Sequence, residues 1–289
     1  MSIHLSLDGA RASRNQDFVN QNEIIALVKQ YQEKLGSRFT YKIQPSNLGC
    51  DAHIYKAITE EMKDFEAIIC LEDDIQIGSL TVSAMVDRYK AGESHVICGM
   101  SPFKSTGKIT NLLIHNKWRR GRYFSAWGYL VSQEFWKDFK ITTNRVEIEN
   151  KLKASRYWGG MPTHKRNTWI GRFQRGNIDY QIQLETFTRD LLIDLPIFRI
   201  IENTGLGDPR ATHTYHKRPK NMFGLGPSTI FPKADSNLKS NVMNLVLNWM
   251  DSNTWAGDGF LSVRGRSAGA RTLVKRALKT AAFKRGKRK

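Results

Sequence analysis

Three consecutive carboxylates, Glu72, Asp73 and Asp74, directly follow a continuous apolar run at residues 67–71. A run of this kind is typical of a strand that is buried on both faces. Ionised carboxylates this close repel one another, and a hard divalent cation such as Mg²⁺ or Mn²⁺ relieves that repulsion. The pattern indicates a site for a metal ion and phosphates, and a solvated acidic turn is the alternative.

Two other polar groups also follow segments that alternate between apolar and polar residues. Asp8 ends such a stretch at residues 3–7, while Asn47 and Gly49 come after a second one at residues 39–43. Alternation predicts half-buried strands. The alternative role for Asp8 is that of an ordinary Asp-Gly turn.

Segments with helical periodicity separate these strands. They lie at residues 18–35, 51–62 and 79–89, and an apolar stretch follows at 96–98. Alternating strands and helices predict an α/β domain with a mostly parallel sheet, whose strands end along one edge. Ligands bind at that edge in open α/β sheets. We therefore expect the three polar groups to line one cleft.

The pattern changes after residue 110 to aromatic and glycine-rich segments. Asp179 follows a Gly-Asn turn there and precedes a predicted helix at residues 180–192. An acidic side chain at such a position can serve simply as an N-cap.

Seven short motifs occur in order, at residues 7–11, 47–50, 71–74, 126–128, 178–181, 203–207 and 211–214. In this series the chain resembles the GT-A glycosyltransferases, in particular bacterial surface-polysaccharide transferases of the broad family 2 type. It is more remotely similar to N-acetylglucosaminyltransferase I. The resemblance covers residues 3–215 and implies a Rossmann-like GT-A sheet flanked by helices. It also implies transfer of a sugar from a nucleotide-sugar donor to a surface glycan or lipid-linked acceptor.

The resemblance implies specific roles for the acidic motif. Glu72, Asp73 and Asp74 occupy the place of the family's DXD element, in which the last aspartate binds Mn²⁺ or Mg²⁺ and an earlier acid contacts the donor. Asp74 is therefore the first expected metal ligand. The other expected donor-binding residues are Asp8, Arg11, Asn47, Gly49 and Trp127. Trp127 could instead be a core residue, and the basic candidates for phosphate contact, Arg11, Lys217 and Arg218, could simply be solvated.

The resemblance also implies a general base. The aspartate that matches Asp179 faces the acceptor hydroxyl in the family and supports an inverting displacement. The alternatives are the N-cap role and a different base such as Glu185. His213 matches a C-terminal histidine that often completes the metal shell in these enzymes, and its alternative is a structural role.

One departure from the family concerns the start of the sheet. GT-A domains normally have an apolar strand and a helix before the strand that ends in Leu-Asp-Gly, and here that strand starts at residue 3. We therefore expect a GT-A sheet without its usual first strand. This leaves open a non-catalytic GT-A-like glycan-binding or scaffold protein. The expected organisation is a donor half at 1–110, an acceptor half at 111–215, a packing segment at 216–263 and a basic tail at 264–289.

The net charge of +18 is concentrated in the tail. Residues 264–289 hold eleven Lys and Arg and no acidic residue, which leaves +7 for the rest of the chain. That charge, without an RNP1-type aromatic motif, does not favour nucleic acid as the partner. Three widely spaced cysteines and the absence of an 18-residue uncharged apolar run favour a cytoplasmic protein.

The tail has the pattern of a basic amphipathic helix. Leu273, Val274, Ala277, Leu278 and Ala281 share one helical face, opposite Lys275, Arg276 and Lys279. This pattern predicts attachment to an anionic membrane surface, here the inner face of the inner membrane. A solvated tail and an RNA-binding arm are the alternatives.

Overall fold

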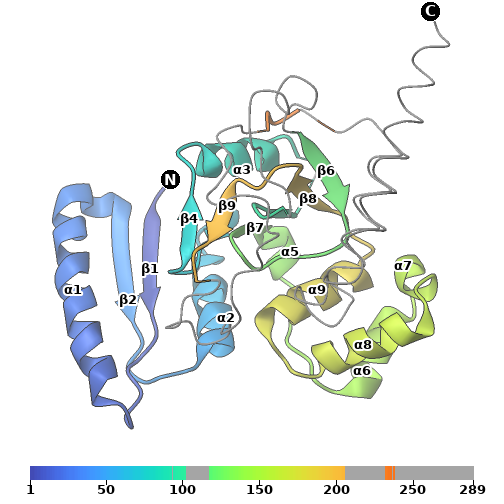
Figure 1. Cartoon of the computed structure of the whole chain (residues 1–289), viewed down its shortest axis with the longest axis horizontal. Helices are drawn as coiled ribbons and strands as arrows, with labels where there is room; N and C mark the ends of the chain where they lie inside the picture. The colour runs from blue at the N-terminus through green and yellow to red at the C-terminus, as the bar shows by residue number, and fades with distance from the viewer. Residues whose placement is uncertain (93, 102–116, 206–231, 236, 238–289) are drawn as a thin grey trace, which may run out of the picture. The chain divides into compact units, whose positions relative to one another are not determined.

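The computed structural model describes residues 1–92, 94–101, 117–205, 232–235 and 237 (Figure 1). The chain divides into two compact units, Met1–Asp64 and Phe65–Lys289. This boundary falls within the donor half expected at residues 1–110. His213, Lys217, Arg218 and the basic tail lie outside the described residues.

The first unit is built on a β-α-β arrangement. Its elements are β1 (Ile3–Leu7), α1 (Asn15–Leu35), the 3₁₀ turn η1 (Gly36–Arg38), β2 (Phe39–Ile43) and α2 (Cys50–Glu61). β1 and β2 pair in parallel, from Ile3 opposite Phe39 to Leu7 opposite Ile43. The strands and helices expected here from periodicity are confirmed.

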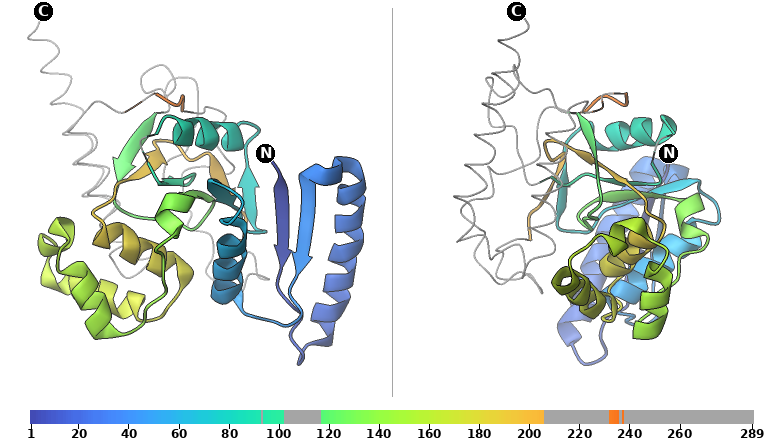
Figure 2. Two further views of the ribbon diagram at one scale, coloured as in Figure 1. Left: turned by 180° about the vertical axis from the view of Figure 1, so that it is seen from behind. Right: turned by 90° about the vertical axis from the view of Figure 1, so that its right-hand side faces the viewer.

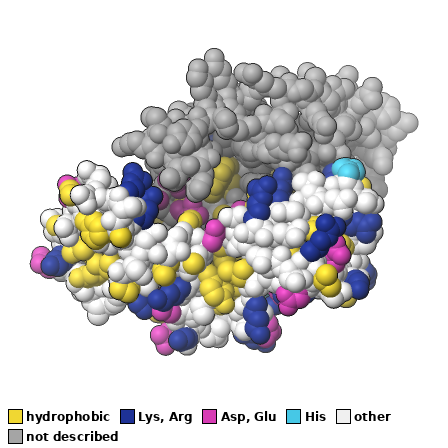
Figure 3. Space-filling model, turned by 90° about the horizontal axis from the view of Figure 1, so that it is seen from below, with side chains coloured by type: hydrophobic (Ala, Val, Ile, Leu, Met, Phe, Trp, Pro, Cys, Tyr) yellow, Lys and Arg dark blue, Asp and Glu magenta, His cyan; other side chains and the backbone are white. Residues whose placement is uncertain are grey.

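Helix α1 leaves much of its apolar surface exposed. Val28 is its one buried residue, whereas Phe18, Val19, Leu27 and Tyr31 are each about half exposed. Figure 3 shows hydrophobic side chains gathered over this unit, on the left of the view. The helix therefore buries only a small part of its apolar surface in this structure.

The second unit contains a five-stranded sheet in the order β3-β7-β5-β8-β6. The strands are β3 (Ala67–Cys70), β7 (Tyr129–Ser132), β5 (Val96–Cys98), β8 (Ile193–Pro196) and β6 (Trp118–Gly121). Among the described strands of this sheet, β5 and β8 pair in parallel and the other neighbours pair antiparallel.

This mixed sheet corrects the expected mostly parallel one, although the α/β class is confirmed. β7 enters antiparallel between β3 and β5, where Val131 lies opposite both Ile68 and Val96. It comes from the part of the chain after residue 110, where the strand-helix alternation is lost. Local periodicity identifies a strand but does not fix the direction in which it pairs.

A short ladder connects two distant segments in this unit. β4 (Ile75–Ile77) pairs antiparallel with β9 (Ile201–Asn203), and α3 (Thr81–Lys90) follows β4. Met85, Ile97 and Ile201 are fully buried in one apolar cluster with parts of the sheet. The cluster anchors both the end of β3 and the start of β9.

Five helices carry most of the remaining described chain. They are α5 (Gln133–Trp136), α6 (Arg145–Leu152), α7 (Arg156–Gly159), α8 (Thr163–Phe173) and α9 (Ile178–Thr188). Figures 1 and 2 show α6, α7, α8 and α9 grouped together, away from α3. Eight of the eleven residues of α9 are buried, so α9 is the central helix of this group. Its neighbours supply an aromatic core that includes Trp158, Trp169 and Phe173.

No helix in the described part of the chain is long and apolar enough to cross a membrane.

Candidate functional site

The turn after β3 is joined to the segment that follows β9. Thr204 donates two hydrogen bonds to the backbone oxygen of Asp74, from its N–H at 2.7 Å and its hydroxyl at 2.8 Å. The β4–β9 ladder places Ile75 opposite Asn203. The structure therefore brings the acidic motif at 71–74 together with the glycine-rich motif that begins at 203.

Of the three acidic residues in this motif, Asp74 has the side chain whose position is most restricted by its neighbours. The Asn203 side chain hydrogen-bonds to its carboxylate, and a side chain at Gly205 would collide with its Oδ2. Its Oδ1 is buried and has no hydrogen-bond partner among the described residues. Burial raises the pKa of Asp74, and the nearby charge of Asp73 raises it further, whereas the hydrogen bond from Asn203 acts in the opposite direction. A partly desolvated carboxylate with an unpaired oxygen is suited to a cation.

The described residues supply only part of a metal shell. No group of three or more His, Cys, Asp or Glu side chains within them is arranged to hold a metal ion. Glu72 is half-buried and Asp73 is exposed. Magnesium-type sites commonly use one or two carboxylates together with substrate phosphates and water. Asp74 fits a site of that kind, and the expected contribution of His213 lies outside the described residues.

A third motif, at residues 126–128, lies beside the same turn. Gly128 has a φ of 68°, and a side chain there would meet Ile201 at 2.8 Å and Leu71 at 3.3 Å. Trp127 is half-buried and packs against the apolar cluster of the sheet. Trp127 thus contributes to the core and remains partly exposed.

Asp8 is the organising residue of the first unit's polar loop. Its Oδ1 accepts hydrogen bonds from the N–H groups of Gly9 and Leu48, at 2.9 and 2.8 Å. Its Oδ2 accepts from the N–H of Gly49 at 2.9 Å and the Asn47 amide at 2.8 Å. Four donors match the acceptor capacity of a carboxylate. The expected neighbours Asp8, Asn47 and Gly49 are therefore together, and Asp8 fixes their loop.

The glycines of this loop are required by its geometry. A side chain at Gly9 would stand 2.2 Å from the backbone of Ser46, and Gly49 has a φ of 80°. Arg11 lies nearby in sequence and forms a two-pronged ion pair with Asp17, with nitrogen-oxygen distances of 2.5 and 3.0 Å. Arg11 is thus engaged with Asp17 at the surface.

Asp179 lies in the first turn of α9 and is partly exposed. The N-cap of α9 is Asn177, two residues earlier, so the alternative prediction that Asp179 is the N-cap is wrong. Its carboxylate nevertheless accepts a hydrogen bond from the N–H of Tyr180 at 2.8 Å. Negative charge is favoured at a helix N-terminus, so an acidic side chain is well placed in this first turn.

Glu185, the other candidate base, is in a different environment. It is 7% exposed and pairs with Arg189 at 2.7 Å and with Lys151 at 3.5 Å. Two cationic partners give it a structural role within the helical group.

Two glutamines that sequence reasoning missed hold α9 in place. Gln181 accepts from the N–H of Thr142 and donates to the backbone oxygens of Thr142 and Phe173. Gln183 accepts from the N–H of Phe124 at 2.6 Å. The same segment also contains Asp179, Glu185, Thr186 and Thr188, so its sequence does not single out the two glutamines. Asn203 was part of a motif, but its bond to Asp74 was not foreseen.

Compared with known proteins, the sequence matches no protein-family model and no curated protein sequence.

Proposed function

We propose that the chain is a metal-dependent glycosyltransferase of the GT-A type. It would transfer a sugar from a nucleotide-sugar donor to a bacterial surface glycan or a lipid-linked acceptor. Three of the motifs that carry the resemblance, at 71–74, 126–128 and 203–205, meet in the second unit. Their convergence around a carboxylate supports donor binding at this turn.

The observation that carries the proposal is the buried Oδ1 of Asp74, which has no hydrogen-bond partner in the part of the chain that the structure describes. Asp74 would bind Mn²⁺ or Mg²⁺ together with the diphosphate of the donor. A bound cation supplies positive charge that stabilises the departing nucleoside diphosphate. Asn203 and Gly205 keep the carboxylate in the required orientation.

Asp179 would act as the general base. Its carboxylate accepts the proton of the acceptor hydroxyl as that oxygen forms a bond to the anomeric carbon. The bond between that carbon and the diphosphate oxygen breaks at the same time, and the oxygen leaves with the electron pair. Attack from the side opposite the leaving group inverts the anomeric carbon. Gln181 and Gln183 hold the helix that carries Asp179.

The basic tail would determine where in the cell the enzyme acts. Residues 264–289 would attach it peripherally to the anionic cytoplasmic face of the membrane, where lipid-linked acceptors are found. Co-sedimentation of the full chain with vesicles containing phosphatidylglycerol tests this. We expect binding that weakens as salt rises and that falls when Lys275, Arg276 and Lys279 are changed to Gln, whereas salt-insensitive binding would contradict it.

A non-catalytic, GT-A-like glycan-binding protein is the second candidate. Glycan binding without any metal-dependent nucleotide binding would support this candidate.

Thermal unfolding with UDP, GDP, CDP, dTDP and CMP tests the proposed function, each with Mn²⁺ and with EDTA. A ligand at one hundred times its dissociation constant stabilises the folded state by about 2.7 kcal/mol. We expect one nucleotide to raise the melting temperature with Mn²⁺ and not with EDTA.

Two variants make this test specific. Asp74→Asn removes the charge of the proposed ligand and should abolish the Mn²⁺-dependent shift. Asp87→Asn makes the same change at an exposed site on α3 and should leave the shift intact. An equal shift in all three proteins would show that Asp74 is not the ligand.

A further inference from the structure

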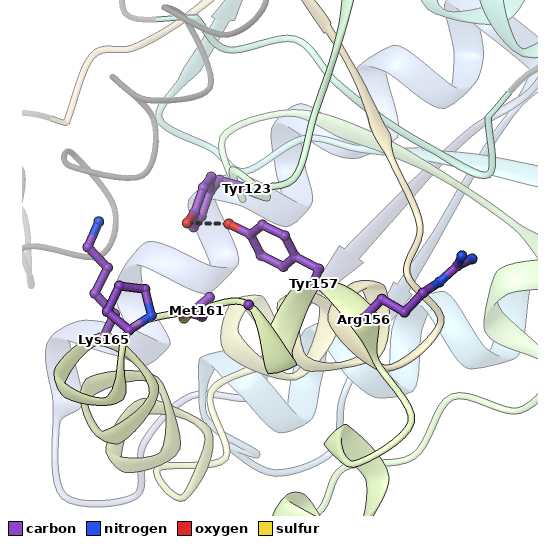
Figure 4. Close-up of a pocket in the computed structure, with 7 residues that line it drawn as sticks. Tyr123, Arg156, Tyr157, Met161 and Lys165 are labelled. Carbon is purple, nitrogen blue, oxygen red and sulfur yellow. Dashed lines mark hydrogen bonds between the residues drawn. The ribbon is translucent and has the colours of Figure 1, made fainter.

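A pocket of about 310 Å³ lies among the helices of the second unit. Small-molecule sites begin at about this size. The lining residues that matter here are Tyr123, Tyr157, Met161, Pro162 and Lys165. None of them has a part in the proposed metal site or in the proposed proton transfer. Figure 4 shows the two tyrosines meeting through their hydroxyl groups, with Lys165 extending from α8 on the other side.

The tyrosine pair forms a rigid polar wall. The hydroxyl oxygens of Tyr123 and Tyr157 are 2.6 Å apart and hydrogen-bonded. The ring of Tyr123 is buried and stacks on Trp169, with a centroid distance of 6.0 Å. The guanidinium of Arg122 lies 4.7 Å from the ring centroid of Tyr157. Both hydroxyls are therefore held where they can exchange hydrogen bonds with the hydroxyls of a ligand.

Asp190 fixes the helix that presents Tyr157. Its carboxylate accepts hydrogen bonds from the Ser155 hydroxyl and from the N–H groups of Arg156 and Tyr157, at 2.8, 2.9 and 3.1 Å. Asp190 itself has a φ of 51°, a conformation that is uncommon outside glycine. The surrounding contacts thus maintain a strained residue that holds the pocket wall.

The charge of the pocket is positive. Arg156 and Lys165 are the charged side chains among its described lining residues. The Arg156 side chain is 96% exposed and points away from the pocket in Figure 4. Lys165 is half-buried and has no ion-pair or hydrogen-bond partner among the described residues. An ammonium group in that setting favours an anionic partner.

We propose that this pocket binds one sugar unit that carries a negative charge, either a carboxylate or a phosphate. Lys165 would contact the acidic group, and the tyrosine hydroxyls would contact the hydroxyls of the sugar. Met161 and Pro162 supply apolar surface for the carbon-bound hydrogens of the ring. We assign this sugar to the acceptor. That assignment rests on the proposed function, whereas the binding of an acidic sugar to the pocket does not.

Ligand-observed NMR and calorimetry with the full chain test the proposal directly. The probes are glucuronate, glucose 6-phosphate, glucose and inorganic phosphate. We expect at least one of the two acidic sugars to bind at least about tenfold more tightly than glucose, because a charged hydrogen bond contributes that much. The acidic sugar that binds more tightly identifies the acidic group as a carboxylate or a phosphate. Inorganic phosphate should bind more weakly than the preferred sugar, and equal binding would overturn the sugar assignment.

Four variants locate the binding. Lys165→Met should weaken binding of the acidic sugar about tenfold and leave binding of glucose unchanged. Tyr157→Phe should weaken binding of both sugars a few-fold. Lys153→Met changes an exposed lysine at the end of α6 and should have no effect. Lys165→Gln gives a second reading if the methionine variant is unfolded. Absence of a preference for acidic sugars, or full binding by both Lys165 variants, would overturn the proposal.

The Asp74→Asn variant separates this proposal from the proposed function. It should bind the acidic sugar normally although it loses the Mn²⁺-dependent nucleotide response. Acidic-sugar binding without any nucleotide response in the unaltered chain would overturn the transferase and leave the pocket assignment standing. A nucleotide response without acidic-sugar binding would support the transferase and overturn the pocket assignment.

Discussion

The carboxylate of Asp74 lies directly against the backbone of Gly205, where a side-chain carbon would stand 2.3 Å from Oδ2. Asp74 and Thr204, which bonds to its backbone oxygen, are 130 residues apart in sequence. The β4–β9 ladder makes this meeting possible by pairing Ile75 with Asn203. The orientation of the proposed metal ligand therefore depends on a glycine far along the chain.

Gly205→Ala should displace Asp74 and remove the Mn²⁺-dependent nucleotide response. We expect it to lower the free energy of unfolding by about 1–3 kcal/mol, because the added methyl group overlaps a fixed carboxylate. Thermal unfolding and nucleotide binding measure the two effects.

The matched control is Gly171→Ala, at a position in α8 where an added methyl group meets nothing within 4 Å. It should keep the nucleotide response and stabilise the chain by up to about 1 kcal/mol through helix propensity. An unchanged response in Gly205→Ala would show that the contact does not orient Asp74.

Asp8→Ala should loosen the loop at residues 47–49. Four hydrogen bonds to one carboxylate are lost, and we expect a cost of several kcal/mol, about 2–4, to the stability of the first unit. All seven tryptophans follow residue 64, so tryptophan fluorescence reports only on the second unit. Hydrogen exchange should therefore rise in residues 39–61 while the fluorescence transition stays in place. Unchanged exchange in that segment would contradict the role given to Asp8.

Asp190→Asn should remove a pH-dependent part of the stability. Burial alone would raise the pKa of Asp190, but hydrogen bonds from the N–H groups of Arg156 and Tyr157 and from Ser155, with the charge of Arg122, bring it below its ordinary value. A lowered pKa stabilises the fold above the unfolded-state value of about 3.9, and this stabilisation is lost as the pH falls through the folded-state pKa.

Urea unfolding of both proteins between about pH 7 and pH 3 measures this contribution. The unaltered chain should be the more stable by about 1 kcal/mol at pH 7, the usual magnitude for a helix cap, and the difference should shrink below about pH 4. Asparagine tolerates the positive φ, so the substitution adds no backbone strain. A difference that does not change with pH would argue against the charge as its cause.

Asp179→Asn should abolish turnover and preserve the nucleotide response. Removing a general base typically slows a reaction by about 10²- to 10⁴-fold. The amide oxygen can still accept the hydrogen bond from Tyr180, so the start of α9 is kept. Release of nucleoside diphosphate from UDP-, GDP- and dTDP-sugars is the measurement.

Glu185→Gln separates the two candidate bases. It breaks the ion pairs with Arg189 and Lys151 and should therefore lower the melting temperature. Turnover below that melting temperature should stay close to that of the unaltered chain. Normal turnover in Asp179→Asn together with loss in Glu185→Gln would transfer the role of base to Glu185.

The sequence predicted the local elements well and the sheet less well. Periodicity located β1, α1, β2, α2 and α3 within a few residues, because each is determined by its own side chains. The antiparallel insertion of β7 between β3 and β5 depends on partners more than 30 residues away. No pattern within residues 129–132 carries that information.

The site was predictable in part, where polar residues directly follow a predicted strand. Asp8, Asn47 and Gly49 meet as expected, and the acidic motif meets the glycine-rich one. Whether these two groups line one cleft stays a prediction. The bond from Asn203 to Asp74 and the buried amides of Gln181 and Gln183 arise from tertiary packing, which residue spacing does not specify.

Electron paramagnetic resonance of free Mn²⁺ tests the central claim most directly. Mn²⁺ is titrated into the chain with each nucleoside diphosphate, into the nucleotide alone, and into the Asp74→Asn variant. We expect about one bound Mn²⁺ per chain in the presence of one nucleotide, beyond what the nucleotide binds by itself, and loss of that site in Asp74→Asn. Binding no greater than that of the nucleotide alone, or an intact site in Asp74→Asn, would contradict it.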